Sequence, residues 1–290
     1  MNPTVELKLG WPAPHMWQVE PGMIRVRHIM AALPAAAFTL LPYGSNSVQA
    51  AEDDGISYAV PYAGVDSIAD STFFYSGAIV ALEPHPNAKS NILIHGFAGR
   101  GEFTYPSVIA PDGEVDGILT WLRGTVGYQT NAGNLRLTGH VGIDYQDYDL
   151  TPNDPGNLVN GSETGFFVSG DIETINPKPL FFSAIGQYST AYEWYWTRVR
   201  TGYAIGQGDY AFQKVIFGPE GIFFGNIGFD AQRAGGFLSF PVKLGSMPLS
   251  ITLSGGYQWI GDDEEGGQVV GGIGGVGDTA YGSLNINAVF

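Results

Sequence analysis

Apolar and polar residues alternate along most of the chain after residue 55. Between 135 and 146, for example, Leu137, Val141 and Ile143 alternate with polar residues such as Thr138 and His140. A period of two is that of a β-strand whose faces meet unlike media. The alternation is ambiguous in the third and seventh segments. Bounded by Pro, Gly, Asn and Asp, the predicted strands are 56–67, 72–83, 91–105, 114–130, 134–150, 162–176, 179–190, 195–208, 212–226, 229–244, 248–261 and 279–290.

The connections between these strands separate a soluble sandwich from a membrane barrel. An outer-membrane barrel has short turns at one end and longer loops at the other. If both termini lie on one side, one end receives 84–90, 131–133, 176–178, 208–210 and 245–247, which are mostly tight. The other end receives the three longest connections, 106–113, 151–161 and 262–278. The pattern therefore predicts an all-β fold, a closed antiparallel transmembrane β-barrel of about 12 strands.

The last predicted strand resembles the assembly signal of bacterial outer-membrane barrels. Leu284, Ile286 and Ala288 fall on one face, and the sequence ends on the aromatic Phe290. Polar residues occupy the opposite face. We therefore expect Phe290 to act as the barrel assembly signal.

A secretory signal peptide is predicted before the barrel. Arg25 and Arg27 form a basic start, 29–41 a short apolar core, and Ala50 ends a small-residue cleavage site. The core is too short to cross a membrane as a helix. The predicted organisation is a non-native extension at 1–22, a cleaved signal peptide at 23–50, and an outer-membrane β-barrel at 51–290.

The composition agrees with a chain whose surface only partly faces water. Charged residues make up 14%, against about 25% in typical soluble domains. The formal net charge of −15 disfavours nucleic acid as a partner. With no cysteine, the chain has no disulfide, thiolate zinc site or cysteine nucleophile.

Charged residues at the polar positions of predicted strands should point into the barrel. The lumen-facing candidates are Arg123, Arg136, His140, Asp144, Asp171, Glu173, Arg198 and Arg200. In an open pore they would set ion preference, whereas in a plugged barrel they would pair with one another. In the second case Arg198 and Arg200 would find acidic partners such as Asp171 or Glu173. The pattern leaves both cases open.

The segment 145–165 reads YQDYDLTPNDPGNLVNGSETG and resembles the BcsS family of cellulose biosynthesis proteins. The matching motif residues include Tyr145, Gln146, Asp147, Pro152, Asp154, Pro155, Gly161, Ser162 and Glu163. Further likeness lies at 114–117, 189–198, 217–220 and 232–236, so that it covers about 56–290, while 262–278 is longer than the family pattern. The resemblance implies a role beside cellulose synthesis at the cell outer membrane. It implies outer-membrane lipid, cellulose and other cellulose-synthesis proteins as partners, and no catalytic residue.

Other sites are weaker alternatives. The oxygens of Asp147, Asp149, Asn153 and Asp154 could suit calcium, but they lack EF-hand spacing, and a turn is favoured. The glycines of 266–277 lack the strand-to-helix context of a phosphate loop. No metal and no cofactor are predicted.

Four aromatic residues cluster around the start of the eighth strand: Tyr192, Trp194, Tyr195 and Trp196. They could stack on sugars, but an aromatic girdle at the membrane surface is favoured.

Three functions follow from the pattern and the resemblance. The first is a non-enzymatic outer-membrane barrel accessory to cellulose biosynthesis, as an exit channel or as a scaffold of the export machinery. The second is a general small-solute porin. The third is an outer-membrane lipid or glycan hydrolase, which is disfavoured because no Gly-x-Ser-x-Gly motif exists and nothing pairs His140 with Ser254.

Overall fold

The computed structural model describes residues 56–82, 90–208, 210–245, 247–261 and 277–289. The strands are β1 (Ile56–Ile68), β2 (Ser71–Leu82), β3 (Ser90–Pro106), β4 (Glu114–Ala132), β5 (Leu135–Thr151), β6 (Gly161–Thr174), β7 (Leu180–Ser189), β8 (Tyr195–Ile205), β9 (Val215–Asn226), β10 (Phe229–Leu244), β11 (Met247–Ile260) and β12 (Thr279–Ala288). Two single-turn 3-10 helices are η1 (Ala191–Glu193) and η2 (Ala211–Gln213). Within this described part, no helix is long and apolar enough to cross a membrane.

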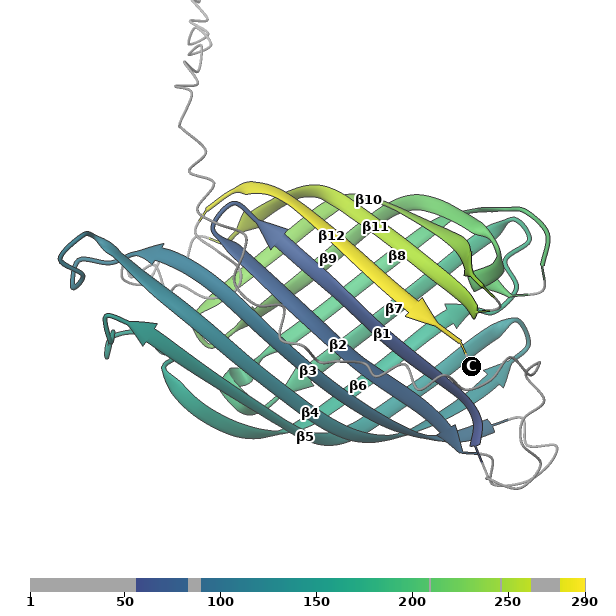
Figure 1. Cartoon of the computed structure of the whole chain (residues 1–290), viewed down its shortest axis with the longest axis horizontal. Coiled ribbons are helices and arrows are strands. Elements are labelled where there is room, and N and C mark those ends of the chain that lie inside the picture. The colour runs from purple at the N-terminus through teal and green to yellow at the C-terminus, as the bar shows by residue number, and fades with distance from the viewer. Residues whose placement is uncertain (1–55, 83–89, 209, 246, 262–276, 290) are drawn as a thin grey trace, which may run out of the picture. The chain divides into compact units, whose positions relative to one another are not determined.

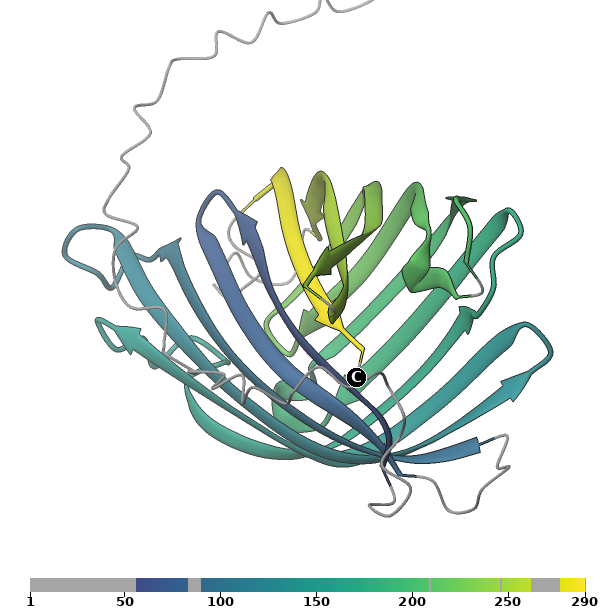
Figure 2. The same cartoon turned by 45° about the vertical axis from the view of Figure 1, so that its right-hand side comes forward.

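The strands form one closed antiparallel barrel in which each pairs with its neighbours in sequence and β1 pairs with β12 (Figures 1 and 2). Closure rests on a register that runs from Tyr62 opposite Asn287 to Ser67 opposite Gly282. Within the described residues, each strand therefore has a hydrogen-bonded neighbour on both sides. The predicted closed antiparallel barrel of twelve strands is confirmed, and the twelve predicted strands agree with the observed ones to within three residues at each end. The signal peptide and Phe290 lie outside the described residues.

Each strand presents one face to the interior and one to the outside. On β4 the interior residues Leu119 and Arg123 are 0% and 7% exposed, whereas the outward Leu122 and Val126 are 50% and 56% exposed. The same alternation on β5 leaves Ile143 exposed beside a fully buried Asp144. Large apolar side chains thus cover the outside. Leaving each of them in water rather than in an apolar medium costs about 1.5–3 kcal/mol.

The two ends differ less in connection length than the pattern predicts. We call the end where β1 begins and β12 ends the near end, and the opposite end the far end. The far end carries connections 107–113, 152–160 and 261–278, but also the tight turns 69–70 and 227–228. At the near end, connection 206–214 is as long as 152–160. Its η2 turn folds back, since the Lys214 Nζ donates to the Asn176 Oδ1 at 2.9 Å.

Candidate functional site in the barrel lumen

The barrel interior holds a cavity of about 620 Å³. Aromatic rings from several strands line it, among them Tyr62, Phe97, Trp196 and Phe224. Charged and small polar groups complete the wall. Inward alternation brings these side chains together from strands far apart in sequence.

The most deeply buried ion pair among the described residues joins Arg123 and Asp144, whose side chains are 3% and 0% exposed. They lie opposite each other on β4 and β5, and the Arg123 Nε is 2.7 Å from the Asp144 Oδ1. The same carboxylate accepts hydrogen bonds from the Trp121 indole at 2.6 Å and from the Gln146 amide at 2.8 Å. The Arg123 guanidinium also lies 3.7 Å from the centre of the Phe167 ring. The pair is enclosed and its carboxylate has several donors, as a buried ion pair requires.

Three further ion pairs lie in the described interior, and two of them join residues directly opposite each other in the strand register. Arg136 lies opposite Glu173, with the Nη2 2.6 Å from the Oε2, and both side chains are partly exposed. Arg200 lies opposite Glu220, whose carboxylate is closed to solvent. The Arg233 Nη1 contacts both oxygens of Asp66 at 2.8 Å.

The prediction that Arg200 pairs with Asp171 or Glu173 is wrong. Arg200 pairs with Glu220, and Glu173 pairs with Arg136. Sequence reasoning missed Glu220, although it lies on the inward face of β9. Only the β8–β9 register, which places Arg200 directly opposite Glu220, could have identified it.

Arg198 and Asp171 make none of these ion pairs. The Nε of Arg198 and the Oδ2 of Asp171 are closed to solvent, and each lacks a hydrogen-bond partner among the described residues. Both lie in one register row, with Ile185 between them on β7. Two strand spacings, or about 9.6 Å, separate their backbones.

His140 lies in a small polar cluster. Its Nδ1 is 3.3 Å from the Thr125 hydroxyl, and its ring centre is 5.6 Å from that of His95. The His95 Nε2 lies 2.6 Å from the Tyr62 hydroxyl. Neither His95 nor Tyr62 was predicted as a site residue; for His95, which lies on β3, the alternation of the sequence is ambiguous.

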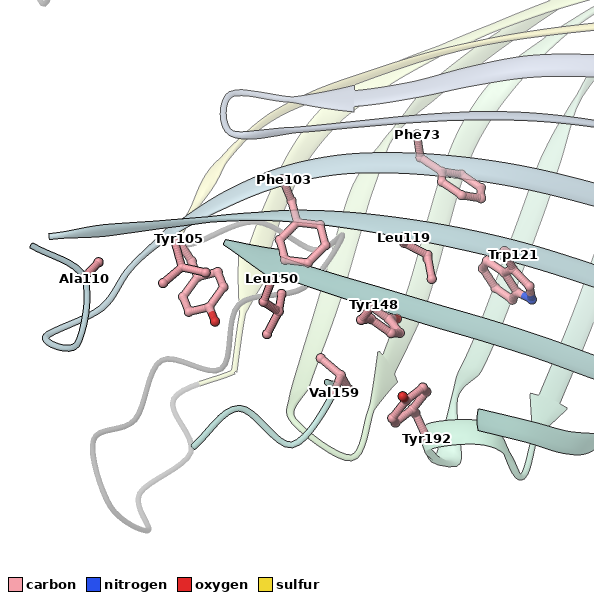
Figure 3. Packing of buried hydrophobic residues seen from close by; sticks show 11 residues of the cluster. Phe73, Phe103, Tyr105, Ala110, Leu119, Trp121, Tyr148, Leu150, Val159 and Tyr192 are labelled. Atoms are coloured by element: carbon pink, nitrogen blue, oxygen red, sulfur yellow. The ribbon is translucent and has the colours of Figure 1, made fainter. Parts of the chain in front are cut away.

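The far end above β3–β5 is closed by connection 152–160, which we call the lid. The Asp154 Oδ2 accepts a hydrogen bond from the Tyr105 hydroxyl at 3.0 Å, and the Asn157 amide donates to the same hydroxyl at 2.9 Å. Val159 is fully buried in a cluster with Tyr148 and Leu150 (Figure 3). The lid is therefore a packed part of the interior.

Two further motif residues, Gly161 and Glu163, hydrogen-bond to Tyr192 of η1 beside the lid. Glu163 accepts a hydrogen bond from the Tyr192 amide at 3.0 Å, and the Tyr192 hydroxyl donates to the Gly161 carbonyl at 2.7 Å. Tyr192 adopts a φ of 53°, an uncommon value for a bulky residue. Burial first, and the charge of Glu163 next, raise the pKa of Tyr192 to about 12, so its hydroxyl stays a donor at neutral pH.

The other motif residues occupy the strands and turns around the lid. Pro152 and Pro155 lie in the lid, while Tyr145, Asp147 and Ser162 lie on β5 and β6, where Asp147 is opposite Ser162. The oxygens considered for calcium do not converge, and no cluster of metal-ligating side chains occurs among the described residues.

The membrane-girdle prediction is wrong for three of the four aromatic residues near β8. Tyr192 is 7% exposed within the interior cluster. Trp194 packs edge-on against Trp121 at 4.5 Å, and Trp194 and Trp196 both line the cavity. Only Tyr195 lies outside, where its hydroxyl donates to Asp230 at 2.6 Å. The alternation of β8, extended back by one residue, places Trp194 and Trp196 on the face of Arg198.

The family model described as cellulose biosynthesis protein BcsS matches residues 60–290. No curated protein matches the chain. Among solved structures, the chain is similar to an outer membrane channel from Pseudomonas putida F1, with 11% identity, a TM-score of 0.48, and coverage of 81% of this chain and 96% of that one. It is also similar to the TodX deltaS2S3 mutant monoaromatic hydrocarbon channel, with 10% identity, a TM-score of 0.46, and coverage of 81% and 89%. LpxR from Salmonella typhimurium shows 13% identity, a TM-score of 0.41, and coverage of 80% and 100%.

Proposed function

The chain belongs to the family of cellulose biosynthesis protein BcsS, and from this premise we propose that it is a non-enzymatic barrel of the bacterial outer membrane whose lumen passes a glucan chain during cellulose export. Outer-membrane lipid, cellulose and the cellulose-synthesis machinery are then its partners.

The outer face of the barrel supports the membrane location. Leu122, Val126 and Ile143 are each at least half exposed, and further large apolar side chains cover the other strands. Monomeric soluble proteins rarely expose apolar patches larger than a few hundred Å². In a bilayer, a closed barrel satisfies its backbone groups internally while this face contacts lipid. The protein should therefore fractionate with the outer membrane.

The lining of the cavity is the observation that supports the passage of a glucan chain. Trp196, Tyr62 and Phe224 present rings to it, beside polar groups such as Ser283 and Asn285. Aromatic faces suit the apolar faces of sugar rings, and a few polar groups suit their hydroxyls. A saccharide chain is the ligand class that needs both.

A scaffold role is the second candidate, and the lid favours it. The lid fills the far end over β3–β5, where Val159 is fully buried and Tyr105 is 2% exposed. A barrel closed by such packing would act through its outer surfaces, by organising the export machinery, and would pass nothing.

The absence of enzymatic activity is also a proposal. The Ser254 hydroxyl, considered as a nucleophile, accepts a hydrogen bond from Arg200 at 2.8 Å and lies 3.4 Å from Glu220. The His140 Nδ1 contacts Thr125. This arrangement supplies Ser254 with no histidine base.

Deletion of the gene, with cellulose measured inside and outside the envelope, tests the proposal. An exit route predicts less extracellular cellulose and a periplasmic increase, restored by the wild-type gene. A scaffold predicts loss of synthesis in both fractions. Unchanged cellulose would contradict both roles and favour a general porin, which liposome swelling with small sugars would then test.

A further inference from the structure

One cation of the lumen has no counterion within the described part of the barrel. Arg123, Arg136, Arg200 and Arg233 each contact a carboxylate within 4 Å. Arg198 contacts none, and its Nε has no hydrogen-bond partner. A charge in an enclosed space is costly unless it is paired and hydrogen-bonded.

The neighbours of Arg198 explain why it stays unpaired. In register it faces Ile185 on β7 and Ile222 on β9, neither of which is an acceptor. The nearest carboxylate along the inward faces belongs to Glu220. That group already accepts from the Arg200 Nε, and the Tyr281 hydroxyl donates to it at 3.2 Å. Glu220 thus serves other donors.

Arg198 borders open space beside an aromatic platform. It lines the cavity of about 620 Å³ together with Trp196. Its guanidinium carbon is 5.2 Å from the centre of a Trp196 ring. A sugar ring that packs on Trp196 would bring its substituents to the guanidinium, whose planar N–H groups match a carboxylate or phosphate with two parallel hydrogen bonds.

We propose that Arg198 is the centre of an anion-binding site in the lumen, and that its ligand is a carboxylate- or phosphate-bearing saccharide seated on Trp196. The saccharide part rests on the proposed passage of a glycan, whereas the anion site does not. An unmodified sugar would leave the guanidinium charge uncompensated. The site therefore distinguishes an acidic glycan from a neutral one.

Isothermal titration calorimetry on the purified full-length protein in detergent, at low chloride, tests this site with glucose, glucuronate and inorganic phosphate as probes. Glucuronate should bind at least about tenfold more tightly than glucose, because only the acid forms the charged pair. If glucuronate binds more tightly than phosphate, the ligand is a glycan substituent. If phosphate binds as tightly or more tightly, the ligand is a free anion. Both results support the anion site. Equal binding of glucose and glucuronate, or no binding of either anion, would overturn it.

Arg198→Met should weaken glucuronate binding at least about tenfold. The affinity of Arg198→Lys should fall between those of the wild type and Arg198→Met, because lysine keeps the charge and loses the planar fork. Arg100→Met, which removes an exposed arginine on the outer face of β3, is the matched control and should leave glucuronate affinity unchanged. Undiminished affinity in Arg198→Met would refute the assignment. Arg198→Met should also fold, because no described residue loses a hydrogen bond or an ion pair. Loss of its heat-modifiable band on a gel would reveal a structural partner and equally refute the proposal. These outcomes are independent of cellulose export in cells, so the site can fail while the proposed function stands.

Discussion

Two regions of the interior differ in how they use inward positions. The far-end wall of β3–β5 is packed with rings and aliphatic groups, including Leu119, Tyr148 and the lid residue Val159. The wall of β10–β12 instead presents short polar groups, among them Ser239 and Ser283, to the cavity. Side-chain volume, and not strand geometry, therefore decides where this barrel is filled and where it is open.

The first prediction has the largest effect and breaks the packed wall. Arg123→Met leaves Asp144, which is 0% exposed, without its cation. We expect a loss of about 3–5 kcal/mol in the free energy of unfolding. Urea unfolding in detergent, followed by the heat-modifiable gel band, measures it.

Arg136→Met is the control for that prediction. Its ion pair is 39% and 29% exposed at the two side chains, so solvent screening limits the loss to about 0–1 kcal/mol. Equal losses of unfolding free energy in Arg123→Met and Arg136→Met would contradict the prediction, because the buried Arg123–Asp144 pair would then stabilise the barrel no more than a solvent-screened pair does.

The second prediction loosens the lid alone. Tyr105→Phe removes the hydroxyl that donates to Asp154 and accepts from Asn157. We expect about 1–3 kcal/mol of local destabilisation because buried polar groups lose their partners. Hydrogen exchange at the amides of Gly156 and Val159, which donate to those same side chains, should become faster.

Tyr128→Phe, on the exposed outer face of β4, is the matched control and should leave lid exchange unchanged. Unaltered exchange in Tyr105→Phe would mean that apolar packing alone holds the lid.

The third prediction has the smallest effect and concerns the open wall. Ser239→Ala removes a hydroxyl that accepts from Thr252 at 3.0 Å and lies 3.2 Å from the Ser250 hydroxyl. Because these groups border the cavity, water can replace the lost partner, and we expect a change of about 0–1 kcal/mol. A loss as large as that of Arg123→Met, in the same urea experiment, would show that this wall is packed too.

The strands were predictable because their period of two is a local pattern. Twelve alternating segments and the pairing of neighbours follow from residues close in sequence. The division of the interior was not predictable, because it depends on register. Arg200 meets Glu220, and Arg198 meets Ile185 and Ile222, only because β7–β9 pair as they do. The lid was read as a turn, and its burial depends on Tyr105, which lies 49 residues from Asp154 in sequence.

Narrowing the open wall tests the proposed passage most directly. Ser283 lines the cavity on β12, and Ser283→Trp would fill part of it, whereas Leu253→Trp places the same side chain on the exposed outer face of β11. Both variants are expressed in the deletion strain, checked for the folded gel band, and compared for cellulose outside and inside the envelope. The account predicts that Ser283→Trp lowers extracellular cellulose and raises the periplasmic fraction, while Leu253→Trp matches the wild type. Normal extracellular cellulose with folded Ser283→Trp would contradict passage through the lumen.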